Sequence, residues 1–204
     1  VQQMCKQGEL PGAVKDGRTW MIPVNVVFED LNAKKKPLPI GVSDFKAATA
    51  GYYYVDKTLL IRDFLDTKPM VSLFTRPRRF GKTLNMDMLR VFFEKTAEDT
   101  SVYFMDKQIW QCGDFYTRHQ GRYPVIFLTF KDVKCLSWEE TFQKIRILIS
   151  LEFMRHSELE NSSVLTTYEK EQYHRLASDS ATEVDCQMGL QLLSMLLHKH
   201  HGKE

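Results

Sequence analysis

The sequence has little of what marks a disulfide-rich, zinc-binding or membrane-spanning protein. Its 204 residues include four cysteines, which lie far apart and form no CxxC pair, and this spacing argues against a disulfide framework or a zinc site. No apolar run approaches the roughly 20 residues that span a bilayer, and no signal-peptide pattern opens the chain. The net charge is only +2, so charge alone does not indicate a nucleic-acid-binding protein. We therefore expect a cytoplasmic protein with free thiols and no membrane contact.

The residues that are present can build a core. Hydrophobic residues make up 43% of the chain and aromatic residues 12%, which is typical of a globular domain. The segment 29–39 is polar and holds two prolines, as a linker does. We expect a small module over residues 1–28, a linker over 29–39 and a larger domain over 40–204. The chain opens on residues typical of a helix interior and stops after a long helical pattern, so we also expect a fragment.

Short apolar runs and long helical patterns alternate in the larger part. The runs 70–75 and 123–130 are rich in β-branched and aromatic residues and predict buried strands. Cap signals and apolar residues at helical spacing predict helices in five places: after Asp56, from Lys82, after the capping box that opens at Ser137, around 166–178 and over about 183–200. This alternation favours an α/β fold, in which helices flank a parallel sheet.

The segment between the first expected strand and the next helix has the composition of a phosphate-binding loop. Gly81-Lys82-Thr83 stands at the helix start, where backbone N–H groups and the helix dipole favour anions. In such loops the lysine reaches the β- and γ-phosphates and the Thr hydroxyl binds Mg²⁺, so ATP and Mg²⁺ are the expected ligands and Thr83 the metal ligand. Arg76 stands where the first glycine of the loop is usual. The expected nucleotide-binding residues are Arg76, Pro77, Arg78, Arg79, Phe80, Gly81, Lys82 and Thr83.

Three segments together resemble the bacterial AAA-ATPase-like family. They are "IGVSDFKAATAGYYYVDKTLLIRDFLD" (40–66), "VSLFTRPRRFGKTLNMDML" (71–89) and "YPVIFLTFKDVK" (123–134). The resemblance implies a phosphate-binding-loop ATPase domain, often followed by a restriction-endonuclease-like domain, in which an arginine-rich start replaces the first glycine. The "YVDKT" segment (54–58) also matches, and the residues leave two interpretations of it open: an aromatic strand with a helix cap, or a contact to adenine.

The sequence lacks one element that hydrolysis requires. In ATPases of this class a second strand ends in acidic residues that hold Mg²⁺ and activate water. The resemblance implies that this strand follows a helix similar to "LLSMLLHKHHGKE" (192–204), where the chain stops. We therefore expect an incomplete domain, truncated before its acidic strand, that binds nucleotide and hydrolyses it poorly. No catalytic residue is assigned.

The N-terminal residues indicate a different function. Residues 1–23 resemble the end of an excisionase-type helix-turn-helix module, with a hairpin wing around Asp16-Gly17. Lys15 and Arg18 at the wing tip would contact DNA phosphates. The alternative function is thus a DNA-binding regulatory module in which the nucleotide unit is a switch or scaffold. A scaffold without any ligand is a third possibility. His198, His200 and His201 lack further ligands at suitable spacing, so no metal site is expected there.

Overall fold

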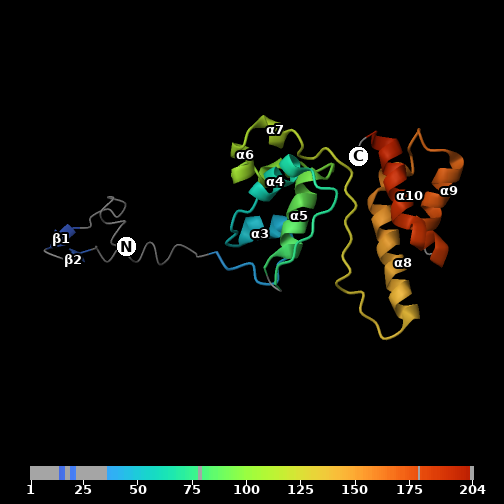
Figure 1. The fold of residues 1–204 in the computed structure, drawn as a ribbon, viewed down its shortest axis with the longest axis horizontal. Coiled ribbons are helices and arrows are strands. Elements are labelled where there is room, and N and C mark those ends of the chain that lie inside the picture. Colours follow the sequence, from blue (N-terminus) through green and yellow to red (C-terminus); the bar gives the residue numbers. More distant parts are fainter. Residues whose placement is uncertain (1–13, 17–18, 22–35, 78–79, 179, 203–204) are drawn as a thin grey trace. The chain divides into compact units, whose positions relative to one another are not determined.

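The computed structural model of the protein describes residues 14–16, 19–21, 36–77, 80–178 and 180–202. The chain divides into two compact units, Val1–Val55 and Asp56–Glu204, whose elements are drawn in Figure 1. The predicted limits of the small module, the linker and the larger domain stay predictions, because most of residues 1–35 lie outside the described part.

The first unit holds a hairpin and a short helix. Strand β1 (Val14–Asp16) pairs antiparallel with β2 (Thr19–Met21), so the hairpin expected at this point is present. Helix α3 (Phe45–Gly51) begins after Asp44, whose side chain accepts a hydrogen bond of 2.7 Å from the N–H of Ala47. This cap satisfies one of the donors that a helix start leaves unpaired.

The second unit opens with a group of short elements around a set of aromatic side chains. Its elements are α4 (Leu59–Thr67), α5 (Lys82–Phe93), the 3₁₀ helix η1 (Thr100–Tyr103), α6 (Gln108–Gln111) and α7 (Asp114–Thr117). Phe92 and Phe104 are completely buried, and their rings meet edge to face with centroids 5.1 Å apart. Ile61, Met88 and Ile109 are completely buried as well. Helix α5 is thereby anchored by its inner face, which leaves its first turn available to solvent.

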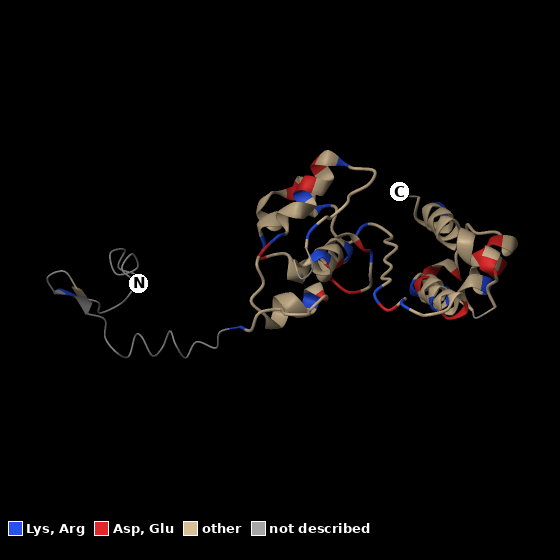
Figure 2. Cartoon of the chain, turned by 60° about the horizontal axis from the view of Figure 1, so that its bottom comes forward, with Lys and Arg blue, Asp and Glu red and all other residues tan. Residues whose placement is uncertain are grey.

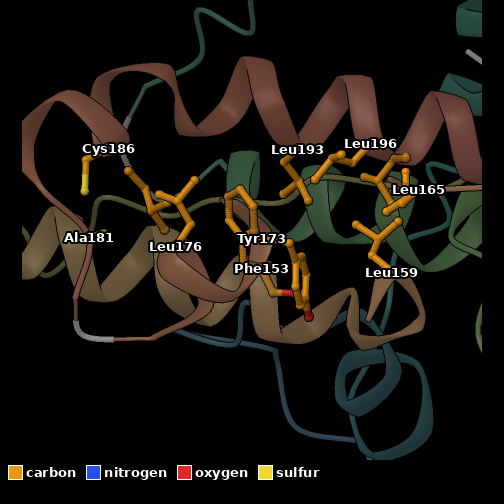
Figure 3. Packing of buried hydrophobic residues seen from close by; sticks show 11 residues of the cluster. Phe153, Leu159, Leu165, Tyr173, Leu176, Ala181, Cys186, Leu193 and Leu196 are labelled. Carbon is orange, nitrogen blue, oxygen red and sulfur yellow. The ribbon is translucent and has the colours of Figure 1, made fainter. Parts of the chain in front are cut away.

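The rest of the second unit is a three-helix group. It consists of α8 (Trp138–Arg155), the 3₁₀ helix η2 (Ser157–Leu159), α9 (Thr167–Ala177) and α10 (Glu183–His201). Ser137 accepts from the N–H of Glu140 at 3.2 Å, which confirms the predicted start of α8. Complete capping boxes open α9 and α10. Figure 3 shows the apolar core between these helices, which includes Phe153, Leu159, Tyr173, Leu193 and Leu196.

The predicted parallel sheet flanked by helices is wrong for this structure. The described residues outside β1 and β2 form no strand, and segments 70–75 and 123–130 carry no ladder. In the described part of the second unit, β-pairing is limited to one isolated parallel bridge between Glu94 and Tyr123. A strand needs a partner for its N–H and C=O groups. Side chains of α8 take this role at two residues of 123–130, because Glu152 accepts from the N–H of Phe127 and Arg155 donates to the carbonyl of Val125.

Three further features are the charge pattern, the thiols and the apolarity of the helices. Basic and acidic residues are interspersed along the described helices (Figure 2). Among the cysteines that the structure describes, Cys112, Cys135 and Cys186 are free thiols, as predicted. Within the described ranges, none of the helices combines the length and the apolarity that a membrane crossing requires.

Candidate functional site

A glycine in a left-handed conformation delivers the chain into α5. Gly81 has φ 72° and ψ 21° and is the N-cap of the helix. Residues with a Cβ adopt this conformation only at a cost, whereas glycine does not. The carbonyl of Gly81 accepts from the N–H of Asn85 at 2.9 Å, which is the first hydrogen bond of the helix. Gly81 therefore marks the end of the loop and the start of the first turn of α5, whose N–H groups have no partner within the helix.

Lys82 folds back over the loop that precedes it. Its Nζ donates to the carbonyl oxygen of Arg76 at 2.5 Å and to that of Pro77 at 3.0 Å. The ammonium thus binds oxygen atoms at the loop start from a position at the helix start. Carbonyl oxygens are neutral acceptors, and phosphate oxygens bind an ammonium more strongly because the hydrogen bond is charge-assisted.

The other predicted site residues lie along the same loop. Thr83 is exposed in the first turn of α5, and this turn carries no acidic side chain that would offset the positive end of the helix dipole. Arg76 and Pro77 are exposed, and Phe80 is 60% exposed. Arg78 and Arg79 lie outside the described residues. The structure therefore brings Gly81, Lys82 and Thr83 to one helix start, with the backbone of Arg76 and Pro77 beside it.

Lys57 also lies at this helix start, which sequence reasoning did not predict. The position that a Cβ atom would take on Gly81 is 3.7 Å from Nζ of Lys57. Lys57 belongs to the "YVDKT" segment, for which the sequence left a helix cap and a contact to adenine both open. Its neighbour Asp56 was predicted to cap the helix after it, but the N-cap residue of α4 is Thr58. Asp56 instead accepts from the N–H of Thr58 at 2.8 Å.

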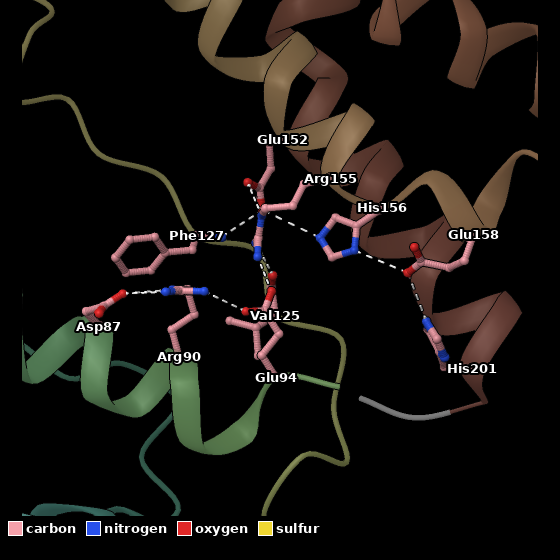
Figure 4. Close-up of polar contacts among 10 residues, drawn as sticks. All are labelled: Asp87, Arg90, Glu94, Val125, Phe127, Glu152, Arg155, His156, Glu158 and His201. Atoms are coloured by element: carbon pink, nitrogen blue, oxygen red, sulfur yellow. Dashed lines mark hydrogen bonds and ion pairs between the residues drawn. The ribbon is translucent and has the colours of Figure 1, made fainter. Parts of the chain in front are cut away.

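A second cluster of charges joins the other end of α5 to α8 (Figure 4). Arg90 lies between two carboxylates, with Nη2 2.7 Å from Oδ1 of Asp87 and Nη1 2.7 Å from Oε2 of Glu94. Arg155 of α8 contacts the other oxygen of Glu94 and binds Glu152 through Nη2 at 2.6 Å. The three carboxylates are buried. Each buried charge therefore has an opposite partner, as a low-dielectric interior requires.

Two more residues extend this cluster and shift each other's pKa. Burial alone would lower the pKa of His156, but Glu152 and Glu158 on either side outweigh it and raise the pKa to about 9. Burial would likewise raise the pKa of Glu152, yet His156, Arg155 and the N–H of Phe127 lower it to about 2. The pKa of Glu158 is also lowered to about 2, because His156 outweighs the effect of its burial. All three groups are charged at neutral pH.

A pocket of about 240 Å³ lies against this cluster, between α5, residues 127–129 and α8. Its charged lining residues are Asp87, Arg90, Glu152 and Arg155. Each of them already forms an ion pair with another side chain of the protein. In the part of the chain that the structure describes, no three His, Cys, Asp or Glu side chains gather as a metal site would need. The loop at the start of α5 is thus the better candidate for a ligand.

Comparison with known proteins identifies the family. The family model described as "Predicted AAA-ATPase" matches residues 39–193, about three quarters of the chain. The chain belongs to this predicted AAA-ATPase family. The matched range contains the loop 76–83, Lys57 and the charge cluster of α5 and α8. The restriction-endonuclease-like domain and the excisionase-type module stay predictions.

A curated protein of Azotobacter chroococcum mcd 1 is similar to part of the chain. It is described as an uncharacterized protein in the vnfD 5′ region and is 35% identical over 98 residues. These residues are 47% of this chain and 17% of that protein, so the chain matches less than a fifth of the relative's length. No solved structure gives a significant match.

Proposed function

We propose that residues 76–83 of this predicted AAA-ATPase family member bind the phosphates of ATP together with Mg²⁺. The observation that carries the proposal is the turn at Gly81. It places an ammonium, a hydroxyl and the N–H groups of the first turn of α5 at one helix start without an acidic side chain in that turn. Helix starts of this kind favour anions through both their N–H groups and their dipole.

Each residue has a distinct part in this binding. Lys82 would leave the carbonyls of Arg76 and Pro77 and neutralise the β- and γ-phosphates, and the hydroxyl of Thr83 would bind Mg²⁺. Arg76, Pro77 and Phe80, with Arg78 and Arg79, would form the wall of the loop. Hydrolysis additionally needs a carboxylate that orients water. No carboxylate is assigned that part, so nucleotide binding, and not hydrolysis, is what we propose for this chain.

A titration with a fluorescent ATP analogue tests the proposal. Trinitrophenyl-ATP with Mg²⁺ is added to the wild-type chain, to Lys82→Ala and to Thr83→Ala, and far-UV circular dichroism verifies that each is folded. We expect saturable binding by the wild type and a roughly hundredfold loss in Lys82→Ala, because a charge-assisted contact is removed. Thr83→Ala should bind equally with Mg²⁺ and with EDTA. Equal affinity of Lys82→Ala and the wild type would overturn the proposal.

A second proposal, DNA binding, rests on the hairpin of β1 and β2. Lys15 is exposed on β1, and Arg18 lies outside the described residues. DNA binding by the hairpin would depend on both side chains and would weaken steeply with salt, because counterions are released from phosphates. Fluorescence anisotropy of a labelled duplex at 50 and 200 mM salt tests this. Binding that persists in the Lys15→Ala/Arg18→Ala variant would contradict it.

A further inference from the structure

The backbone at Lys57 is held from both sides. The Oδ1 atom of Asp56 accepts from the N–H of Thr58 at 2.8 Å and from its hydroxyl at 2.7 Å. The other oxygen, Oδ2, accepts from the N–H of Gln108 at 2.8 Å, and the Thr58 hydroxyl accepts from the N–H of Ile109 at 3.2 Å. Asp56 and Thr58 thus bind residues 56–58 to the start of α6 through hydrogen bonds. Lys57 stands between them on a fixed stretch of chain.

The side chain of Lys57 reaches the start of α5 while its neighbours face α6. Lys57 is exposed, and its Nζ lies 3.7 Å from where a Cβ on Gly81 would be. Among the described residues, no carboxylate forms an ion pair with Lys57 or Lys82. The adjacent carboxylate of Asp56 is occupied by its three hydrogen bonds. Two ammonium groups therefore lie at one helix N-terminus, and no carboxylate of the described residues pairs with either.

Like charges at a positive helix end repel one another unless an anion is bound. The arrangement is stabilised when a ligand with several negative charges occupies it. A polyphosphate has this chemistry, and its oxygens can accept from two ammonium groups at once.

We propose that Lys57 is a second phosphate-binding cation of this site. It contacts the phosphate that lies at Gly81, so that Lys57 and Lys82 bind the polyphosphate from two sides. This inference rests on the proposed nucleotide function of residues 76–83. It gives the "YVDKT" segment a function: Asp56 and Thr58 position the chain, and the lysine binds the ligand.

The experiment compares two ligands on matched variants. Trinitrophenyl-ATP with Mg²⁺ is bound to the full chain and then displaced by ATP or by inorganic tripolyphosphate. The variants are Lys57→Gln, which removes the charge, and Lys57→Arg, which keeps it. Lys170→Gln on α9 is the control, and Lys82→Ala reports on the proposed function itself. Circular dichroism verifies folding, which an exposed side chain should not affect.

We expect Lys57→Gln to weaken both ATP and tripolyphosphate roughly tenfold, since one charge-assisted contact is lost. Lys57→Arg should stay within about threefold of the wild type, and Lys170→Gln should be unchanged. If Lys82→Ala loses binding while Lys57→Gln does not, the inference about Lys57 is overturned and the nucleotide site stands. A loss for ATP alone would place Lys57 at the base or ribose and would also overturn it. If the wild type binds neither ligand, both proposals fail.

Discussion

The two ends of helix α5 carry positive charge in opposite ways. At its last turns, Arg90 lies between two buried carboxylates, and Arg155 of α8 contacts one of them. At its first turn, Lys82 donates to the neutral carbonyls of Arg76 and Pro77, and Lys57 lies beside Gly81. The partners of a cation therefore separate structural charges from charges that can bind a ligand. A cation with carboxylate partners holds elements together, whereas cations gathered without them are available to an anion from outside.

Removal of a buried carboxylate should give the largest effect. Glu152→Gln removes the carboxylate that Arg155 and His156 share, so that Arg155 keeps only Glu94 and His156 only Glu158 among the described carboxylates. The loss of one charge from a buried, paired cluster is costly. We expect a loss of about 3 kcal/mol in the free energy of unfolding, measured with urea. Glu139→Gln in the exposed first turn of the same helix is the matched control and should change it by less than about 0.5 kcal/mol. An equal loss of stability in both variants would contradict the structural part assigned to the buried cluster.

Because of the same cluster, the free energy of unfolding should be highest over a limited range of pH. The lowered pKa of about 2 for Glu152 and Glu158 means that their contribution is complete above about pH 4.5 and is lost as the pH falls toward 2. The raised pKa of about 9 for His156 means that its contribution is complete below about pH 6.5 and is lost as the pH rises through 9.

Urea unfolding at a series of pH values checks this window. We expect a decline on the order of 2 kcal/mol between pH 6.5 and pH 9.5. His156→Asn should be less stable at pH 6 and should show a flatter profile above it. An unchanged alkaline decline in His156→Asn would assign the decline to another group.

The turn at Gly81 should give a smaller effect on stability. Gly81→Ala forces a Cβ into a left-handed conformation with φ 72°, which should cost about 1 kcal/mol. The matched control is Gly51→Ala at the end of α3, where an added Cβ meets nothing within 4 Å and φ is not positive. That variant should be neutral or slightly stabilised. If both variants lose the same stability, strain at Gly81 is not the reason.

The lysine of the loop should give the smallest effect on folding. Among the described residues, the Lys82 side chain forms hydrogen bonds only within its own loop, so Lys82→Ala should change the free energy of unfolding by less than about 0.5 kcal/mol. Thermal unfolding without nucleotide measures this. A loss comparable to that of Glu152→Gln would mean that Lys82 is structural, and the contrast between the two ends of α5 would disappear.

Sequence reasoning predicted the elements whose signals are local. The helices that became α8, α9 and α10 follow from apolar residues at helical spacing and, for α8, from the capping box that opens at Ser137. The Gly-Lys-Thr start of α5 was found in the same way. The short helices α3, α6 and α7 were missed, because four to seven residues carry too little periodicity.

What could not be predicted depends on contacts between distant residues. The expected strands 70–75 and 123–130 have apolar, β-branched sequences, but a strand forms only where a partner pairs with it, and the side chains of α8 bind 125–127 instead. Lys57 reaches Gly81 because Asp56 is bound to Gln108, 52 residues further on. Arg155 and Glu94 are separated by 61 residues. Spacing along the chain contains no signal for these contacts.

The most direct test of the account is thermal unfolding with and without saturating Mg²⁺-ATP, measured for the wild type, Lys82→Ala and Glu152→Gln. A ligand at 100 times its dissociation constant stabilises the folded state by about 2.7 kcal/mol. We expect the wild type to gain this shift and Glu152→Gln to unfold earlier but keep the shift. Lys82→Ala should unfold like the wild type without nucleotide and gain no more than about 0.4 kcal/mol, because its affinity is a hundredfold lower. An equal nucleotide shift in Lys82→Ala, or no shift in the wild type, would contradict the account.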